Sequence, residues 1–121
     1  RALSRRPLAA RRLLLTIRRH LEQRMLALAF EPADARLWGR ISREAGAYLQ
    51  SLHERGALGG ARPDEAYFVR CDESTNPPEL RRLGVVHAEI GVTPAATLEF
   101  IVLRLRVDPQ ARAATVDENP A

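Results

Sequence analysis

Three histidines and one cysteine are the side chains of this sequence best suited to metal binding or catalysis. His20 and His53 fall in two separate segments of helical periodicity, and His87 falls in a segment that alternates like a strand. A structural zinc site needs four ligands at short, characteristic spacings, and one cysteine with three scattered histidines does not supply them. We therefore place the histidines on helix flanks and on the exposed face of a strand, and predict no metal and no cofactor.

Cys71 stands beside Asp72 and would be a nucleophile if its pKa were lowered. It also follows Phe68 and Val69 in a β-rich run, where a free cysteine is usually a small buried hydrophobic residue. The glycine-rich segment 56–60 lacks the Lys-Ser/Thr of a phosphate-binding loop and follows a helix rather than a strand. We therefore predict that the chain is not an enzyme. Four glutamates show no pairing that acid–base catalysis demands: Glu73, Glu79, Glu89 and Glu99.

The charge of the chain is basic and is carried by one residue type. The net charge is +4, and all 19 basic residues are arginine. An arginine surface suits either nucleic acid or an acidic protein partner. Aromatic residues make up only 5% of the sequence, so base stacking is poorly supplied, and we find no known nucleic-acid reader motif. A small basic nucleic-acid-binding module is thus kept as the alternative function.

Length and hydropathy limit the organisation further. A chain of 121 residues supports one domain with a modest core. No apolar run approaches the ~20 residues that span a bilayer, and residues 1–6 contain no apolar signal region. The absence of an initiator methionine leads us to expect a piece of a longer protein. A single cysteine rules out a disulfide within the chain and favours a reducing compartment.

Two segments have the periodicity of amphipathic helices. The first covers residues 8–29 and follows Pro7, and the second starts at the predicted N-cap Asp34 and runs to about Arg55. The buried stripe of the first is Leu14, Ile17, Leu21, Met25 and Leu28, and that of the second is Leu37, Trp38, Ile41, Ala45, Tyr48, Leu49 and Leu52. Leu15 is an apolar residue on the charged face of the first helix.

The second half of the chain has the pattern of strands and turns. Residues 67–69, 86–92 and 98–107 are predicted strands, and Asn76-Pro77-Pro78-Glu79 has the form of a capping box that starts a short helical turn. Helices that precede strands indicate an α+β fold, with two amphipathic helices packed on a small, mainly antiparallel sheet of about three strands. We divide the chain into a linker (1–7), a folded domain (8–107) and a flexible tail (108–121).

Six short blocks of the sequence, in order over residues 11–107, resemble the C-terminal domain of contractile tail sheath proteins. Those proteins form the outer cylinder of contractile phage tails, R-type pyocins and extracellular contractile injection systems. The blocks are Arg11-Arg12-Leu13, Phe30-Glu31-Pro32 with Leu37-Trp38, Gly56-Ala57-Leu58 with Gly60, Phe68-Val69-Arg70-Cys71-Asp72, Glu89-Ile90-Gly91-Val92-Thr93-Pro94 and Glu99-Phe100-Ile101-Val102.

The resemblance implies a mechanical function. Copies of such a subunit build a helical cylinder around an inner tube protein, and the cylinder drives the tube by contraction without nucleotide hydrolysis. The implied partners are the chain itself, the tube, and the baseplate and tail-end proteins. Assembly would occur in the bacterial cytoplasm, and the product would be part of a phage tail or a tail-like particle that can be released from the cell.

The resemblance also implies two contact surfaces. Arms of neighbouring subunits add strands to the sheet of such a domain, and we predict that they do so at the edge of the last strand. An arginine-bearing helix face would contact the tube, on the first helix or, alternatively, on the second through Arg36, Arg40 and Arg43. The predicted strand edge is Phe100, Ile101, Val102, Leu103, Leu105 and Val107, and the predicted tube contact is Arg11, Leu15, Arg18, Arg19 and Glu22.

Overall fold

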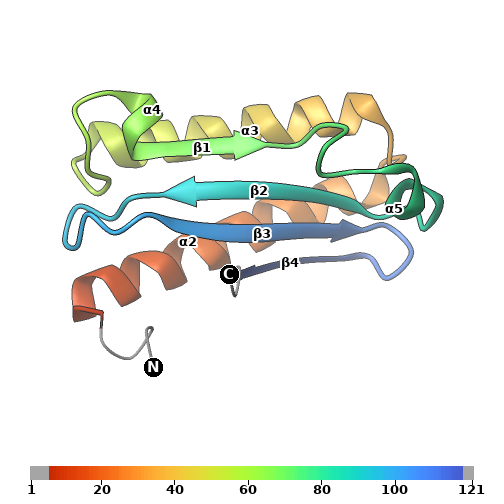
Figure 1. The fold of residues 1–121 in the computed structure, drawn as a ribbon. Coiled ribbons are helices and arrows are strands. Elements are labelled where there is room, and N and C mark those ends of the chain that lie inside the picture. Colours follow the sequence, from red (N-terminus) through yellow and green to blue (C-terminus); the bar gives the residue numbers. More distant parts are fainter. Residues whose placement is uncertain (1–5, 119–121) are drawn as a thin grey trace.

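Two long helices pack on one face of a four-stranded antiparallel sheet in the computed structural model, which describes residues 6–118 (Figure 1). The fold class is α+β, as predicted, with one strand more than the three expected. Most of the predicted linker (1–5) and the last residues of the predicted tail (119–121) lie outside the described residues.

Helix α2 (Leu8–Leu26) begins directly after Pro7 and continues as one 3₁₀ turn, η1 (Ala27–Phe30). The turn ends before Pro32, because proline disfavours helical geometry in the residue that precedes it. The buried side of the helix is Ala10, Leu14, Ile17, Leu21 and Met25, which confirms the predicted stripe.

Helix α3 (Ala35–Glu54) starts at the predicted cap, where the Asp34 carboxylate accepts a hydrogen bond from the Leu37 amide at 3.1 Å. It ends at Glu54, and Gly56, two residues later, has a left-handed φ of 82°, as predicted from its position after the helix. Tyr48, predicted on the buried stripe, is only partly buried and stacks on His20.

The sheet is a meander in the order β1-β2-β3-β4, with every neighbouring pair antiparallel. β1 (Tyr67–Arg70) follows the short helix α4 (Pro63–Ala66), and α5 (Pro78–Arg82) lies between β1 and β2 (Val86–Val92). β3 (Ile101–Asp108) is the third strand, and β4 (Ala113–Glu118) forms the far edge.

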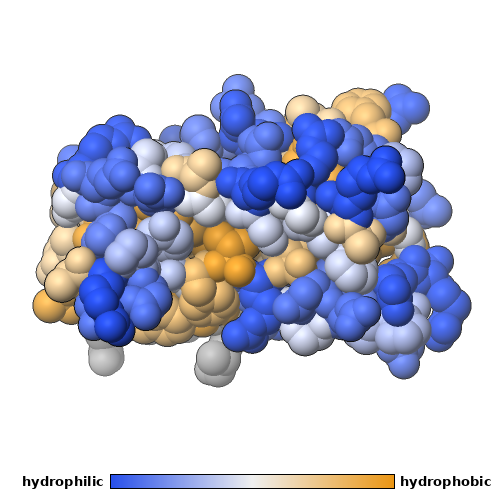
Figure 2. All heavy atoms as spheres, turned by 90° about the horizontal axis from the view of Figure 1, so that it is seen from above, coloured by the Kyte–Doolittle hydropathy of each residue, from blue (hydrophilic) through white to orange (hydrophobic). Residues whose placement is uncertain are grey.

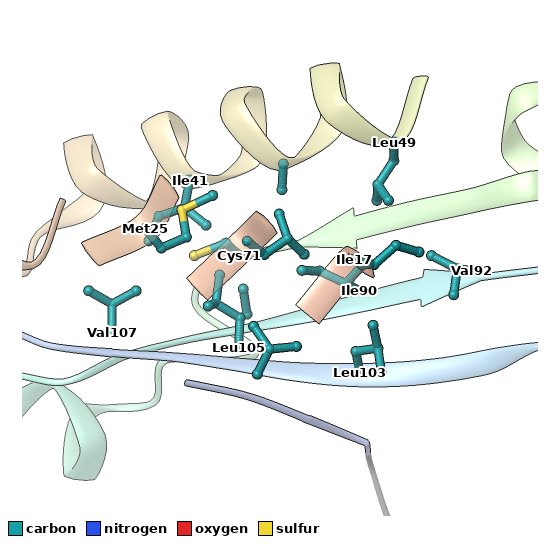
Figure 3. Packing of buried hydrophobic residues seen from close by; sticks show 14 of the residues in the cluster. Ile17, Met25, Ile41, Leu49, Cys71, Ile90, Val92, Leu103, Leu105 and Val107 are labelled. Carbon is teal, nitrogen blue, oxygen red and sulfur yellow. The ribbon is translucent and has the colours of Figure 1, made fainter. Parts of the chain in front are cut away.

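The core lies between the helices and the sheet. Side chains of both helices meet the inward residues of the strands there (Figure 3). Alternation along β3 sends Ile101, Leu103, Leu105 and Val107 inward and leaves Arg104 and Arg106 on the other face. On the face seen in Figure 2, hydrophobic residues extend from one end toward the middle and are surrounded by hydrophilic ones.

The predicted flexible tail is wrong for residues 113–118, which form β4. The Asp108 carboxylate accepts hydrogen bonds from the amides of Gln110 and Ala111, and Arg112 adopts a positive φ of 51°, so the chain reverses there. The returning segment then pairs with β3 over its whole length. Because Val116 is its only strongly apolar residue, composition alone gives no strand signal there.

Candidate functional site

Two of the three histidines make a side-chain contact in the fold, whereas Nδ1 of His87 is buried without a hydrogen-bond partner among the described residues. His20 stacks on Tyr48 with ring centroids 3.7 Å apart, and the His53 ring lies 2.8 Å from the Gly60 carbonyl oxygen. His87 is partly buried on β2, where burial, and then Arg106 and Arg104, lower its pKa. Within residues 6–118 no three His, Cys, Asp or Glu side chains gather closely enough to hold a metal ion.

Cys71 is buried against the backbone of β2. Its thiol lies 3.6 Å from the His87 carbonyl oxygen, and the Asn76 amide nitrogen lies 3.9 Å from its sulfur. Burial raises the pKa of the Cys71 thiol to about 12. A thiol with that pKa is almost entirely protonated at neutral pH. Cys71 therefore fits the description of a small buried hydrophobic residue better than that of a nucleophile.

The predicted strand edge on β3 is wrong. β3 pairs with β2 on one side and with β4 on the other, so Ile101, Val102, Leu103, Leu105 and Val107 lie in an interior strand. Phe100 precedes the strand and is 54% exposed. The error follows from the missed β4, which occupies the position that a neighbouring subunit was expected to fill.

The two edges of the sheet are therefore β1 and β4, and side chains close parts of both. Beyond the end of β1, the Asn76 amide nitrogen donates to the His87 carbonyl at 3.0 Å, and the His87 amide donates to the Asn76 oxygen at 2.8 Å. On the other side, the Val116 amide donates to Glu22 at 2.9 Å, and Arg18 Nε donates to the Val116 carbonyl at 2.8 Å.

A buried arginine fastens the end of β4. Arg6 donates two hydrogen bonds to the Glu118 carboxylate, at 3.0 and 2.7 Å, and one to Glu99 at 3.3 Å. These bonds hold the pKa of Glu118 below its ordinary value of 4.5, although partial burial opposes the shift. The segment before α2, the start of β3 and the end of β4 are thus tied together by one guanidinium.

The residues predicted to contact the tube do not form one outward face. Arg18 and Glu22 are engaged with β4, as described above, and Arg18 also lies 3.8 Å from Asp117. Leu15, 42% exposed, and Arg11 border a hollow of about 230 Å³ between α2 and the ends of β3 and β4. Arg19 is exposed as well and, with Gln23 and Leu26, borders a second hollow beside the start of β4.

A second cationic area lies between the two helices. A hollow of about 470 Å³ is bordered by the His20–Tyr48 stack and by Arg24, Arg40 and Arg43. Arg24 pairs with Glu44 at 2.8 Å and Arg40 pairs with Glu31, whereas the described residues place no carboxylate at ion-pair distance from Arg43. The sequence pointed to Arg36, Arg40 and Arg43 as the alternative contact, but it did not reveal that α2 contributes Arg24 and His20.

The open face of the sheet carries an aromatic pair. Phe68 and Phe100 stack with centroids 5.8 Å apart over Gly91, where a Cβ would lie 2.3 Å from the Phe68 ring. The Arg70 guanidinium lies 5.4 Å from the Phe68 ring centroid and also pairs with Glu89 at 3.3 Å. Rings and guanidinium groups together could stack on bases, although a carboxylate already partly neutralises this area.

Comparison with protein-family models and with curated proteins gave no significant match for this chain. In the described part of the chain, no helix combines the length and the apolar character that a membrane crossing requires. The fold is therefore a small α+β domain in which side chains close parts of both sheet edges. The exposed arginines of α2 and α3 form its cationic helix layer.

Proposed function

We propose that this chain is the inner, C-terminal domain of a contractile tail sheath subunit. The observation that carries the proposal is that the sequence blocks resembling the sheath family are neighbours in the fold. Phe68 of one block pairs with Gly91 of a second, and Gly91 pairs with Val102 of a third. Blocks that meet at one place in a sheet form one structural unit, and this supports the proposal.

A fourth block joins the same group. The Gly59 amide donates to the Thr93 carbonyl at 2.7 Å, and the Ala95 amide donates to the Ala57 carbonyl at 3.0 Å. The loop after α3, which contains the Gly-Ala-Leu block, is thereby fixed to the end of β2. Gly91 has a clear physical role in the group, because any side chain at that position would collide with Phe68 and Phe100.

In the proposed assembly, copies of the subunit form a helical cylinder around an inner tube, with baseplate and tail-end proteins at its ends. Arms of neighbouring subunits would extend the sheet at its true edges instead of at β3, namely at β1, or at β4 once Arg18 and Glu22 release Val116. Contraction would release energy stored in a metastable extended lattice and consume no nucleotide. The particle would assemble in the bacterial cytoplasm.

The cationic helix layer is the surface we assign to the tube. Exposed Arg–carboxylate pairs are individually worth about 0–1 kcal/mol, so a contact that must release during contraction can be built from several of them. Five arginines of α2 and α3 are exposed and have no carboxylate at ion-pair distance among residues 6–118: Arg11, Arg12, Arg19, Arg36 and Arg43.

Negative-stain microscopy of the full-length gene product that contains this chain tests the proposal. We expect hollow cylinders of regular diameter. A product that stays monomeric or forms only irregular aggregates, with its predicted tube protein present, would contradict the sheath assignment.

The alternative is a small basic nucleic-acid-binding module, and the aromatic pair on the open sheet face is the observation that favours it. Aromatic rings flanked by arginine are a common way to bind single strands. Retention of the chain on single-stranded DNA should then fall steeply with salt, and replacing Phe68 and Phe100 by Leu should abolish it. If the variant were retained as well as the unaltered chain, the retention would come from charge alone and the aromatic pair would not be a nucleic-acid site.

A further inference from the structure

The outer edge of β4 is closed by two side chains of α2. In an antiparallel pair, the backbone groups of successive residues point alternately toward and away from the partner strand. The bonds from Val116 to Glu22 and Arg18 show that its amide and carbonyl point away from β3. Ala114 and Glu118, two residues to either side, belong to the same outward set.

Arg18 and Glu22 match the bonding of a strand. They are four residues apart, so they lie on the same side of α2. Glu22 supplies the acceptor for the Val116 amide and Arg18 supplies the donor for its carbonyl, which are the two groups that one residue of a further strand would supply. Both are charged, and charge-assisted hydrogen bonds are stronger than those between neutral backbone groups.

Hollows lie on both sides of this bridge along the groove between α2 and β4. One is bordered by Leu15 and Glu118 and the other by Leu26 and Ala114. Leu15 and Leu26 are both more than 40% exposed, so apolar surface borders the strand edge on each side of the bridge. The first four residues of this edge strand, 113–116, carry no charge and no proline, the features that usually discourage pairing with another chain, whereas Asp117 and Glu118 at its end are charged.

We propose that Arg18 and Glu22 form an edge cap, which prevents β4 from pairing with β4 of a second copy of this chain. With the cap closed, the middle of the edge offers no free amide or carbonyl. With the cap removed, Ala114, Val116 and Glu118 present a continuous row of outward backbone groups between apolar borders. Pairing of two such edges would give a twofold-symmetric dimer with a continuous eight-stranded sheet. The inference concerns the isolated chain and does not depend on the sheath proposal.

The test compares the oligomeric state of two double variants by sedimentation over a concentration series. We expect Arg18→Ala/Glu22→Ala to lower the dimer dissociation constant by about tenfold or more, because a second copy then satisfies backbone groups that the cap no longer reaches. Arg12→Ala/Thr16→Ala is the matched control, since it removes one arginine and one polar residue, also four positions apart, from an exposed part of α2 that borders neither hollow. The control should behave like the unaltered chain.

A proline substitution distinguishes dimers that pair through the β4 edge from non-specific self-association. Ala114 belongs to the outward set, so Ala114→Pro removes an outward donor and no bond to β3, and proline is accepted on edge strands. Added to the cap-removed variant, Ala114→Pro should restore the monomer. Dimers that persist with the proline would overturn the proposal, because they would arise elsewhere.

A cap-removed variant that is folded by circular dichroism and remains as monomeric as the control would also overturn it. If the double variant does not fold, Glu22→Ala alone is measured in the same way. That single change frees the Val116 amide and keeps the Arg18 bond, so it should give a smaller fall in the dissociation constant, again reversed by Ala114→Pro. A folded Glu22→Ala chain with unchanged self-association would overturn the proposal.

Discussion

The side-chain amide of Asn76 pairs with the backbone of His87 as a residue of a neighbouring strand would. It accepts a hydrogen bond from the His87 amide at 2.8 Å and donates one to the His87 carbonyl at 3.0 Å. β1 ends at Arg70, opposite Glu89, so the first residues of β2 have no strand on that side. One buried side chain thus extends the sheet beyond the end of a short edge strand.

Asn76→Ala should destabilise the domain by about 2–4 kcal/mol, because it removes both bonds to the His87 backbone together with the bonds to the Asp72 carbonyl and the Thr75 hydroxyl. Asn76 is fully buried, so water cannot replace the lost partner without a local opening. Ser74→Ala in the same turn is the control, since the Ser74 hydroxyl is exposed and bonds only Asp72. Denaturant unfolding measures both, and equal stability of the two variants would show that the Asn76 pairing contributes little.

Cys71 should be almost unreactive in the folded chain. Its thiol is buried and its pKa is raised to about 12, so the thiolate fraction at pH 8 is very small. We expect a disulfide reagent at pH 8 to modify the folded chain far more slowly than the chain unfolded in denaturant. Rapid modification of the unaltered folded chain would contradict the buried position of Cys71.

The Arg6 clamp should stabilise the domain in a way that depends on pH. The folded pKa of Glu118 is depressed, so its contribution is complete above its ordinary value of 4.5 and is lost as the pH falls through the lower folded pKa. At pH 7 we expect Glu118→Gln to cost about 1–3 kcal/mol, as for a bond between charged groups. The difference from the unaltered chain should shrink below pH 4.5. A difference that stays constant from pH 7 to pH 3 would argue against an ionic clamp.

The side chain of Trp38 should contribute strongly to the free energy of unfolding. It is 7% exposed on the inner side of α3, and the Arg81 guanidinium lies 5.7 Å from its ring centroid. Trp38→Ala should cost about 3–5 kcal/mol in the free energy of unfolding. Arg81→Ala removes only an exposed cation–π contact and should cost less than about 1 kcal/mol. An unchanged melting temperature in Trp38→Ala would mean that α3 presents a different face to the sheet.

Sequence reasoning identified the helices well because their signals are local. The stripe from Leu14 to Met25 and the cap at Asp34 both depend on neighbours within one or two turns, and the fold confirms them. Asn76 was interpreted as a helix cap because Pro77-Pro78-Glu79 follows it. In the fold its amide bonds His87 instead, and α5 has no side-chain cap. A local pattern cannot reveal that a strand eleven residues later competes for the same side chain.

The contact surfaces were harder to predict for the same reason. Spacing placed Arg18 and Glu22 on one side of the first helix, but their partner, Val116, lies more than 90 residues away in a segment without strand periodicity. Because β4 was not predicted, two further predictions were wrong: that β3 has a free edge, and that the charged face of α2 is free. Leu15 was correctly recognised as an exposed apolar residue on a charged helix face, although that face borders β4.

Charge reversal on the helix layer tests which helix contacts the tube. Arg18 is unsuitable because it bonds Val116, so we choose Arg12→Glu/Arg19→Glu on α2 and Arg36→Glu/Arg43→Glu on α3, all at exposed positions. Both double variants change the net charge by the same amount, and each serves as the control for the other. Neither should shift the melting temperature by more than a few degrees, because exposed charges contribute little to folding. In the full-length product, the double variant on the helix that contacts acidic groups of the tube should form fewer extended particles. The double variant on the other helix should form them normally. Normal extended particles from both variants, counted by electron microscopy, would remove the helix layer as the tube contact.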